Sequence, residues 1–331
     1  MFKRNHYSVA KSIVSGLCMA FMASVLGSGL AVAQEYPVKP ITVIVPYPPG
    51  STTDSLMRML SPKLTERLGQ PIIVENRSGA STSIGSSHVA HAAADGYTIL
   101  IQAPNIVTNE YMFDNLDWKY SDFKPVTLLV RWSNILVAGP AAPTKDFSDM
   151  VAAGKNGSST FTYGTPGIGS LSHLAIEMLN RDAGLSMAHI TYNGPAPMTT
   201  DLLGGHIKYG VTNPANLMPL VLDKKNQVTP LVVLSSRRDP TIPNIPSLAD
   251  FGIDGIDSNG WLGIVVPAQT PDAIVERLNS AFVGALSDDG IQKRVKSLYL
   301  ESIGSTPESF AEYLDSESRK WGEAIKAANI R

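Results

Sequence analysis

Small hydroxyl residues follow a turn rich in proline and glycine near the start of the sequence. Residues 44–54 read IVPYPPGSTTD, in which an apolar run meets a turn and then a helix-like pattern. The S-x-x-D spacing of Ser51 and Asp54 is typical of a helix N-cap, and this role accounts for Asp54, whose charge would repel an anion. The first N–H groups of a helix lack partners within the helix and carry a partial positive charge, which suits an anion. The turn therefore predicts a carboxylate site, although an ordinary capped turn would use the same residues. The candidate binding residues here are Tyr47, Pro49, Gly50, Ser51, Thr52 and Thr53.

A second turn of this kind lies in the middle of the chain. Residues 163–179 read YGTPGIGSLSHLAIEML, with a strand-like start and a helix expected from Ser170 or Leu171. Glycines in such a turn allow a ligand to approach the main chain closely. We interpret the histidine in the first helical turn as a packing or hydrogen-bonding residue rather than a catalytic base. The candidates from this turn are Gly167, Ile168, Gly169, Ser170 and His173.

Cofactor, nucleophile and metal motifs are weak or missing. G-x-G-x-x-G would need a glycine at Ser172, and G-x-S-x-G does not occur, so we expect no cofactor and no enzyme activity. His88 and His91 have an i, i+3 spacing but no matching cysteine or carboxylate, so we expect no metal ion. The polar cluster NRSGASTSIGSSHVA, residues 76–90, is either a surface loop or a further donor-rich rim. It adds Ser81 and Thr82 to the candidates, and Asn213 completes the set.

The first 33 residues have the layout of a secretory signal peptide. Lys3 and Arg4 precede an apolar stretch, and Ala31-Val32-Ala33 gives an A-x-A cleavage pattern. A membrane anchor is the alternative, but glycines interrupt the stretch. We expect cleavage after Ala33, a periplasmic product and, because Cys18 lies in the leader, no disulfide. A net charge of −2 predicts no nucleic-acid partner.

Short apolar runs alternate with helical patterns along the rest of the chain, which predicts an α/β protein. Helices are expected over 53–68 and 171–183, and also over 270–286 and 306–328, which both open with Thr-Pro as N-cap and first helical residue. Many of the strands are continuous apolar runs, as expected of strands buried on both faces of a sheet. The expected strands are 41–46, 71–76, 97–102, 126–130, 134–139, 161–165, 188–192, 207–212, 230–235 and 261–267.

An ordered series of these motifs resembles the periplasmic solute-binding receptors of tripartite tricarboxylate transporters, the Bug family. The segments PYPPGSTTDSLMRML, GTPGIGSLSHLAIEML and GWLGIVVPAQTPDAIVERLN carry the resemblance, which extends over nearly all of the chain after the leader. The resemblance implies a two-lobed, type II Venus-flytrap protein with a mixed sheet in each lobe. Lobe 1 would be 34–133 and 258–331, and lobe 2 would be 134–257.

The resemblance also implies a function. Such receptors bind small carboxylates, often di- or tricarboxylates, through main-chain N–H groups, hydroxyls and waters of the two facing turns rather than through arginine. We therefore expect a monomer that captures a small organic carboxylate and delivers it to membrane transporter subunits.

Departures from the family pattern leave the ligand open. Ser51 replaces a usual second glycine, GASTSIG replaces a more glycine-rich run, and Asn193 stands where a basic residue is common. An aromatic dicarboxylate stacked on Tyr47 is one interpretation. Two other functions are weighed against transport: a sensor that presents its closed form to a membrane histidine kinase, and an exported hydrolase with Ser170 as nucleophile and His173 as base.

Overall fold

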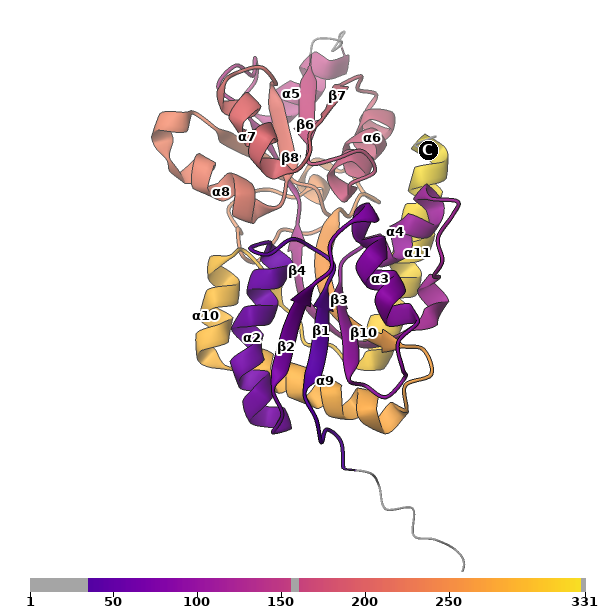
Figure 1. Ribbon diagram of the computed structural model, residues 1–331. Coiled ribbons are helices and arrows are strands. Elements are labelled where there is room, and N and C mark those ends of the chain that lie inside the picture. The colour runs from indigo at the N-terminus through magenta and orange to yellow at the C-terminus, as the bar shows by residue number, and fades with distance from the viewer. Residues whose placement is uncertain (1–34, 156–160, 329–331) are drawn as a thin grey trace, which may run out of the picture. The chain divides into compact units, whose positions relative to one another are not determined.

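The computed structural model describes residues 35–155 and 161–328, so the predicted signal peptide lies outside the described residues. From Lys39 onward the described residues belong to one compact unit, which contains two sheets (Figure 1). Within these residues, no helix is long and apolar enough to cross a membrane. The two sheets and their helices form the two lobes expected from the sequence. We call the lobe with the six-stranded sheet the first lobe and the lobe with the five-stranded sheet the second lobe.

The first lobe is built on a six-stranded mixed sheet in the order β11-β4-β10-β3-β1-β2. Strands β1, β2 and β3 are parallel, whereas β10 runs antiparallel to both of its neighbours, β3 and β4. The strands are β1 (Ile41–Val45), β2 (Ile72–Asn76), β3 (Thr98–Gln102), β4 (Phe123–Ser133), β10 (Asn259–Pro267) and β11 (Glu301–Ser302). The helices are α2 (Thr52–Leu68), α3 (Ser83–Ala90), α4 (Asn105–Met112), α9 (Asp272–Leu286), α10 (Asp289–Ser297) and α11 (Pro307–Ala328).

The second lobe is built on a five-stranded mixed sheet in the order β7-β6-β8-β5-β9. Strand β6 is parallel to β7 and β8, and β5 is antiparallel to β8 and β9. Its strands are β5 (Ile135–Ala138), β6 (Thr162–Thr165), β7 (Ala188–Thr191), β8 (Tyr209–Thr212) and β9 (Thr229–Val233). Its helices are α5 (Phe147–Lys155), α6 (Leu171–Ala183), α7 (Pro195–Leu203) and α8 (Pro214–Leu222). Short 3₁₀ turns cover Ala80–Thr82, Tyr120–Asp122, Lys224–Asn226 and Leu248–Phe251.

The chain passes between the sheets at two adjacent crossings. The first is at Ser133 and Asn134, between β4 and β5, and the second is at Ser258, which enters β10. The Asn134 amide donates to the Ser258 hydroxyl over 2.8 Å, and the backbone N–H of Ser133 donates to the buried carboxylate of Asp239 over 2.9 Å. The strands thus change sheets close to residues 133/134 and 257/258, while the exact lobe boundaries stay a prediction.

Apolar contacts also join the lobes, through α6 and α11. Leu174 of α6 lies in one buried cluster with Trp321 and Ile325 of α11. Glu317, one turn before Trp321 on α11, links this cluster to the first sheet. Its carboxylate accepts from the Trp321 indole N–H over 3.0 Å and from the indole N–H of Trp261 on β10 over 3.2 Å. Helix α11 is therefore anchored on the first sheet while its outer turns reach the second lobe.

The predicted strands all appear, although β4 is longer than expected and the two-residue β11 was missed. One predicted cap is confirmed at α11, where Ser309 N–H donates to the Thr306 hydroxyl over 3.2 Å. The prediction of Thr270 as the equivalent cap at α9 was wrong. The Thr270 hydroxyl donates to the Pro267 carbonyl over 2.7 Å, so Pro271 takes the N-cap position and the helix begins at Asp272.

Close packing of α11 on β10 gives a stability test. A Cβ on Gly263 would lie 2.2 Å from the Phe310 ring, which is fully buried. We expect Gly263→Ala to destabilise the protein by about 1–3 kcal/mol, because the ring must move in a filled core. Denaturant unfolding followed by circular dichroism measures the change. Gly167→Ala is the control, since its new methyl group meets open space. Equal unfolding midpoints for the two variants would contradict the packing argument.

Candidate ligand-binding cleft

A cleft of about 580 Å³ lies between the lobes and receives residues from both. Among the described residues, five helices start at it: α2, α4, α6 and α7 with their first residues, and α8 with its N-cap. None of the described residues that line it is Asp, Glu, Lys, Arg or His. An anion held here would therefore meet peptide dipoles and neutral polar groups. The lining residues are Tyr47, Gly50, Ser51, Thr52, Thr53, Ala103, Pro104, Asn105, Trp132, Asn134, Ser170, Leu171, Ser172, Pro195, Thr212, Asn213, Asn216, Gly260 and Leu262.

The start of α2 forms the first wall. Ser51 caps the helix by accepting from Asp54 N–H over 3.2 Å, as the sequence predicted. The first two helical N–H groups, those of Thr52 and Thr53, have no acceptor among the described residues. Gly50, at φ +81°, makes the turn that precedes the cap, in a conformation that favours glycine. The unpaired donors at this helix start therefore border the cleft.

The Asp54 carboxylate holds this wall from behind. It is buried, and it accepts from Gly50 N–H over 2.9 Å, from the Asn76 amide over 2.9 Å and from Arg58 over 3.0 Å. Burial alone would raise the pKa of Asp54, but the hydrogen bonds from Arg58, Gly50 and Asn76 outweigh burial and lower it. Asn76 also donates to the Tyr47 carbonyl over 3.1 Å. Arg58 is thus committed to Asp54 and stays out of the cleft.

The start of α6 forms the opposite wall. Ser170 caps this helix by accepting from His173 N–H over 3.3 Å, which leaves the N–H groups of Leu171 and Ser172 without an acceptor among the described residues. The sequence suggested Gly169 as a ligand donor instead. Its N–H is already donated to Nδ1 of His173 over 3.1 Å. The free donors of this wall therefore lie two to three residues further along the chain.

Helices α4 and α8 complete the polar lining. Asn213 is the N-cap of α8 and accepts from Asn216 N–H over 3.1 Å. Asn105 begins α4, accepts from the Tyr47 hydroxyl over 3.1 Å, and donates to Ser81 over 3.3 Å. Burial raises the pKa of Tyr47 well above its ordinary value, so its phenol stays neutral and donates this bond. Tyr47 is therefore oriented by the first residue of a neighbouring helix.

Some candidate residues lie beside the cleft rather than in it. The candidates Ser81, Gly167, Ile168 and Gly169 line a smaller cavity of about 220 Å³, and Asn105 and Ser170 line both cavities. Three candidates border neither cavity. Pro49 is exposed, Thr82 is buried with its hydroxyl near the Gln102 amide at 3.3 Å, and His173 is buried. The site assignments themselves stay predictions.

Several lining residues were missed by the sequence analysis. Trp132 and Gly260 come from β4 and β10, Asn134 comes from the crossing between β4 and β5, and Asn105 comes from a helix that was not predicted. Asn216 of α8 was also missed, although the T-N-P run that contains the predicted Asn213 was a usable signal, because Asn followed by Pro is a typical helix start. Strand residues at a crossing carry no comparable local signature.

A pair of stacked histidines supports the α6 turn. The rings of His173 and His189 are 3.9 Å apart and nearly parallel. His189 Nε2 lies 2.7 Å from the Thr165 hydroxyl, which donates to the Gly167 carbonyl over 3.2 Å. His173 Nε2 lies 3.9 Å from Glu177. Nδ1 of His173 is thus occupied by the Gly169 N–H, and among the described residues no hydrogen bond joins the His173 ring to the Ser170 hydroxyl, as a serine hydrolase would need.

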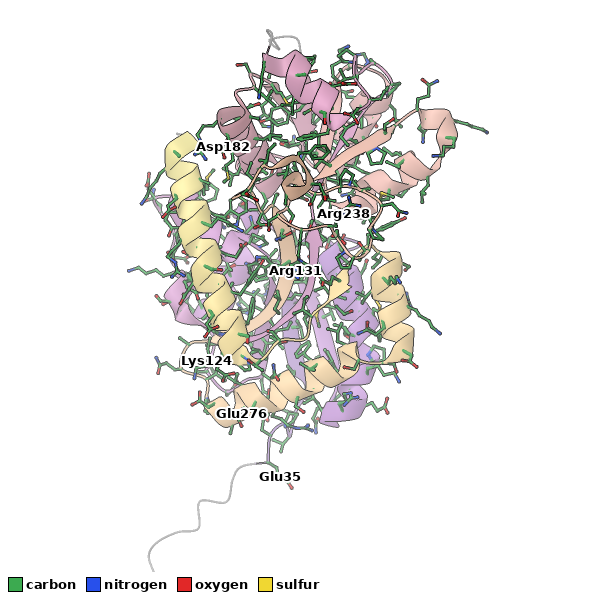
Figure 2. All side chains as sticks on the ribbon, turned by 180° about the vertical axis from the view of Figure 1, so that it is seen from behind. Glu35, Lys124, Arg131, Asp182, Arg238 and Glu276 are labelled. Atoms are coloured by element: carbon green, nitrogen blue, oxygen red, sulfur yellow. The ribbon has the colours of Figure 1, made fainter. Side chains whose placement is uncertain are left out.

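His88, His91 and Arg131 have partners of their own. His88 Nδ1 lies 3.1 Å from the Arg77 guanidinium, and His91 Nδ1 lies 2.9 Å from the Ser87 carbonyl. Arg131, labelled in Figure 2, precedes Trp132 on β4 and pairs with Glu301 at 2.9 Å. Neighbouring strand residues point to opposite faces, so Arg131 points away from the cleft that Trp132 lines.

The histidine pair predicts a pH dependence of stability. Burial, and then the neighbouring His173, lower the pKa of His189 to about 4. Burial also lowers the pKa of His173. An unfolded histidine has a pKa of about 6.5, so between pH 6.5 and 4 the unfolded chain binds more protons than the folded one. We expect the unfolding temperature to fall as the pH drops through this range. Glu177, which faces His173, opposes the effect without reversing it.

His189→Gln tests the assignment, because its amide can still donate to Thr165 while the titrating ring is gone. Differential scanning calorimetry from pH 7.5 to 4 should show a shallower decline for this variant than for the unchanged chain. Identical slopes would place the pH dependence elsewhere.

Comparison with known proteins shows which family this chain belongs to. The profile of the tripartite tricarboxylate transporter family receptor matches residues 56–330. BugT of Bordetella pertussis is 28% identical over 90% of this chain and 92% of its own length. Rpa4515 of R. palustris with adipate has a TM-score of 0.77 at 30% identity, covering 89% of this chain and 99% of that one. MatC from Rhodopseudomonas palustris with bound malate has a TM-score of 0.73 at 28% identity, covering 88% and 100%. With its two mixed sheets, the chain belongs to the receptor family of tripartite tricarboxylate transporters, which includes the Bug periplasmic binding proteins.

Proposed function

We propose that this protein captures a small carboxylate, with two or three carboxyl groups, in the cleft between its lobes and delivers it to a tripartite tricarboxylate-type transporter. The observation that carries the proposal is the meeting of several helix starts in one cleft whose described lining residues bear no charge. The relatives with adipate and malate support the ligand class. The exported form would begin after Ala33 and act as a monomer in the periplasm.

Recognition by backbone dipoles explains how a carboxylate is held without a cation. The N–H groups of Thr52 and Thr53 approach from one lobe, and those of Leu171 and Ser172 approach from the other. Each helix start adds a partial positive charge, and fixed donors replace water without rearranging. A ligand with two carboxylates can engage both walls at once, which favours closure of the lobes about the crossings.

Isothermal titration of the exported chain is the direct test. The panel contains malate, adipate, citrate, succinate and terephthalate, with the matching amides as uncharged controls. We expect saturable binding of at least one acid and no binding of its amide, because the site is complementary to negative charge. A folded protein that binds none of the acids would refute the proposal.

Proline substitution can remove one backbone donor at a time. Proline is tolerated at the first position of a helix, and Ser51 and Ser170 have ψ of 162° and 154°, which a following proline accepts. Thr52→Pro and Leu171→Pro should each weaken binding by about 10- to 100-fold, the loss of one charge-assisted hydrogen bond.

Alanine variants supply the matched controls for these prolines. Thr52→Ala keeps the N–H and loses the hydroxyl, which we expect to cost about 1 kcal/mol at most. Leu171→Ala likewise keeps its N–H. Titration of all four folded variants separates the backbone donor from the side chain. If each proline variant binds like its alanine partner, the helix starts do not hold the ligand.

A further inference from the structure

We propose that the cleft selects carboxylates built on a flat aromatic ring, with Trp132 as the specificity-determining residue. This inference rests on the proposed function and adds the shape of the ligand to it. Trp132 lies at the end of β4, next to the crossing between the lobes, and it is partly exposed where it lines the cleft. A tryptophan in that position offers a large, flat apolar face to whatever the helix starts bind.

The indole is fixed in place by the strand opposite. Trp132 and Gly260 are directly paired in the antiparallel ladder of β4 and β10. A Cβ on Gly260 would lie 2.2 to 2.5 Å from three atoms of the indole, so the ring rests on the bare main chain of Gly260. Gly260 is buried and also borders the cleft. A ring held in this way is preorganised, and binding a ligand costs little side-chain entropy.

Aromatic covering of a strand glycine is also a common structural device, and it would explain the contact with Gly260. It does not explain why the same indole keeps exposed surface inside a cavity of about 580 Å³. The other lining residues with apolar surface include Tyr47, Leu171 and Leu262, so the cleft combines apolar side chains with the polar groups of the helix starts. That arrangement matches an acid with a flat apolar centre and carboxylates at its ends.

Two dicarboxylates of the same charge and similar span separate stacking from simple burial. Terephthalate has an aromatic ring, and trans-cyclohexane-1,4-dicarboxylate is its saturated counterpart. Aromatic pairs gain interaction energy beyond the area that they bury, so we expect the exported chain to prefer terephthalate by roughly 3- to 10-fold. In Trp132→Leu the two acids should bind with about equal affinity, and in Trp132→Phe the preference for terephthalate should be intermediate. Adipate, which has no ring, is titrated alongside.

The possible results fall into distinct groups. A preference for the aromatic acid that is lost in Trp132→Leu and partly kept in Trp132→Phe supports the inference. Equal affinities for the two cyclic acids in the unchanged chain overturn it, whatever the variants do. A preference that stays undiminished in folded Trp132→Leu also overturns the role of Trp132. If adipate still binds in these cases, the proposed function stands; if none of the acids binds, the proposed function itself fails.

Discussion

The first N–H groups of a helix have no carbonyl within that helix to bond, and in the described part of this protein five helices begin at one cleft. Each capping serine or asparagine satisfies part of this demand, but the first two N–H groups of α2 and of α6 remain without an acceptor among the described residues. Donors left in this way need water or a ligand. The two sheets, the paired crossings and the caps together bring these unsatisfied groups to the same space.

The charged groups around the cleft serve the architecture. Asp54 is buried at the α2 start, where a carboxylate would oppose an anion, yet Arg58 and Asn76 bond it and the turn depends on it. His173 plays the matching part at α6, since its ring accepts the N–H of Gly169. In both walls a side chain behind the turn fixes the backbone, and the donors in front stay free. The cleft lining is therefore uncharged because Asp54 and His173 make their hydrogen bonds behind the two turns, outside the cleft.

Local features of the sequence predicted much of this arrangement. The N-cap at Ser51 follows from the S-x-x-D spacing, and a helix start at Ser170 or Leu171 was expected from the turn before it; the structure has both. The alternation of strands and helices gave the α/β class, and the resemblance gave the two lobes. The errors arose where a nearby group competed for a partner. Thr270 was expected to cap α9, but its hydroxyl bonds the preceding turn.

Contacts between distant parts of the chain could not be predicted in this way. Trp132 lies in the cleft because its strand pairs with Gly260, which is far away in sequence. The residues next to Trp132 in the sequence do not predict its pairing with Gly260. The same holds for Glu317, whose role depends on two indoles that come together only when α11 packs on β10.

The apolar cluster shared by α6 and α11 has a consequence for how solutes reach the interior. Leu174, Trp321 and Ile325 are buried together, so separating the lobes on that side would wet a patch of hydrocarbon. A movement about the crossings that spares this patch would keep α6 and α11 in contact and widen the cleft at the edge remote from α11. Under the proposed function, the solute would enter and leave the cleft at that one edge.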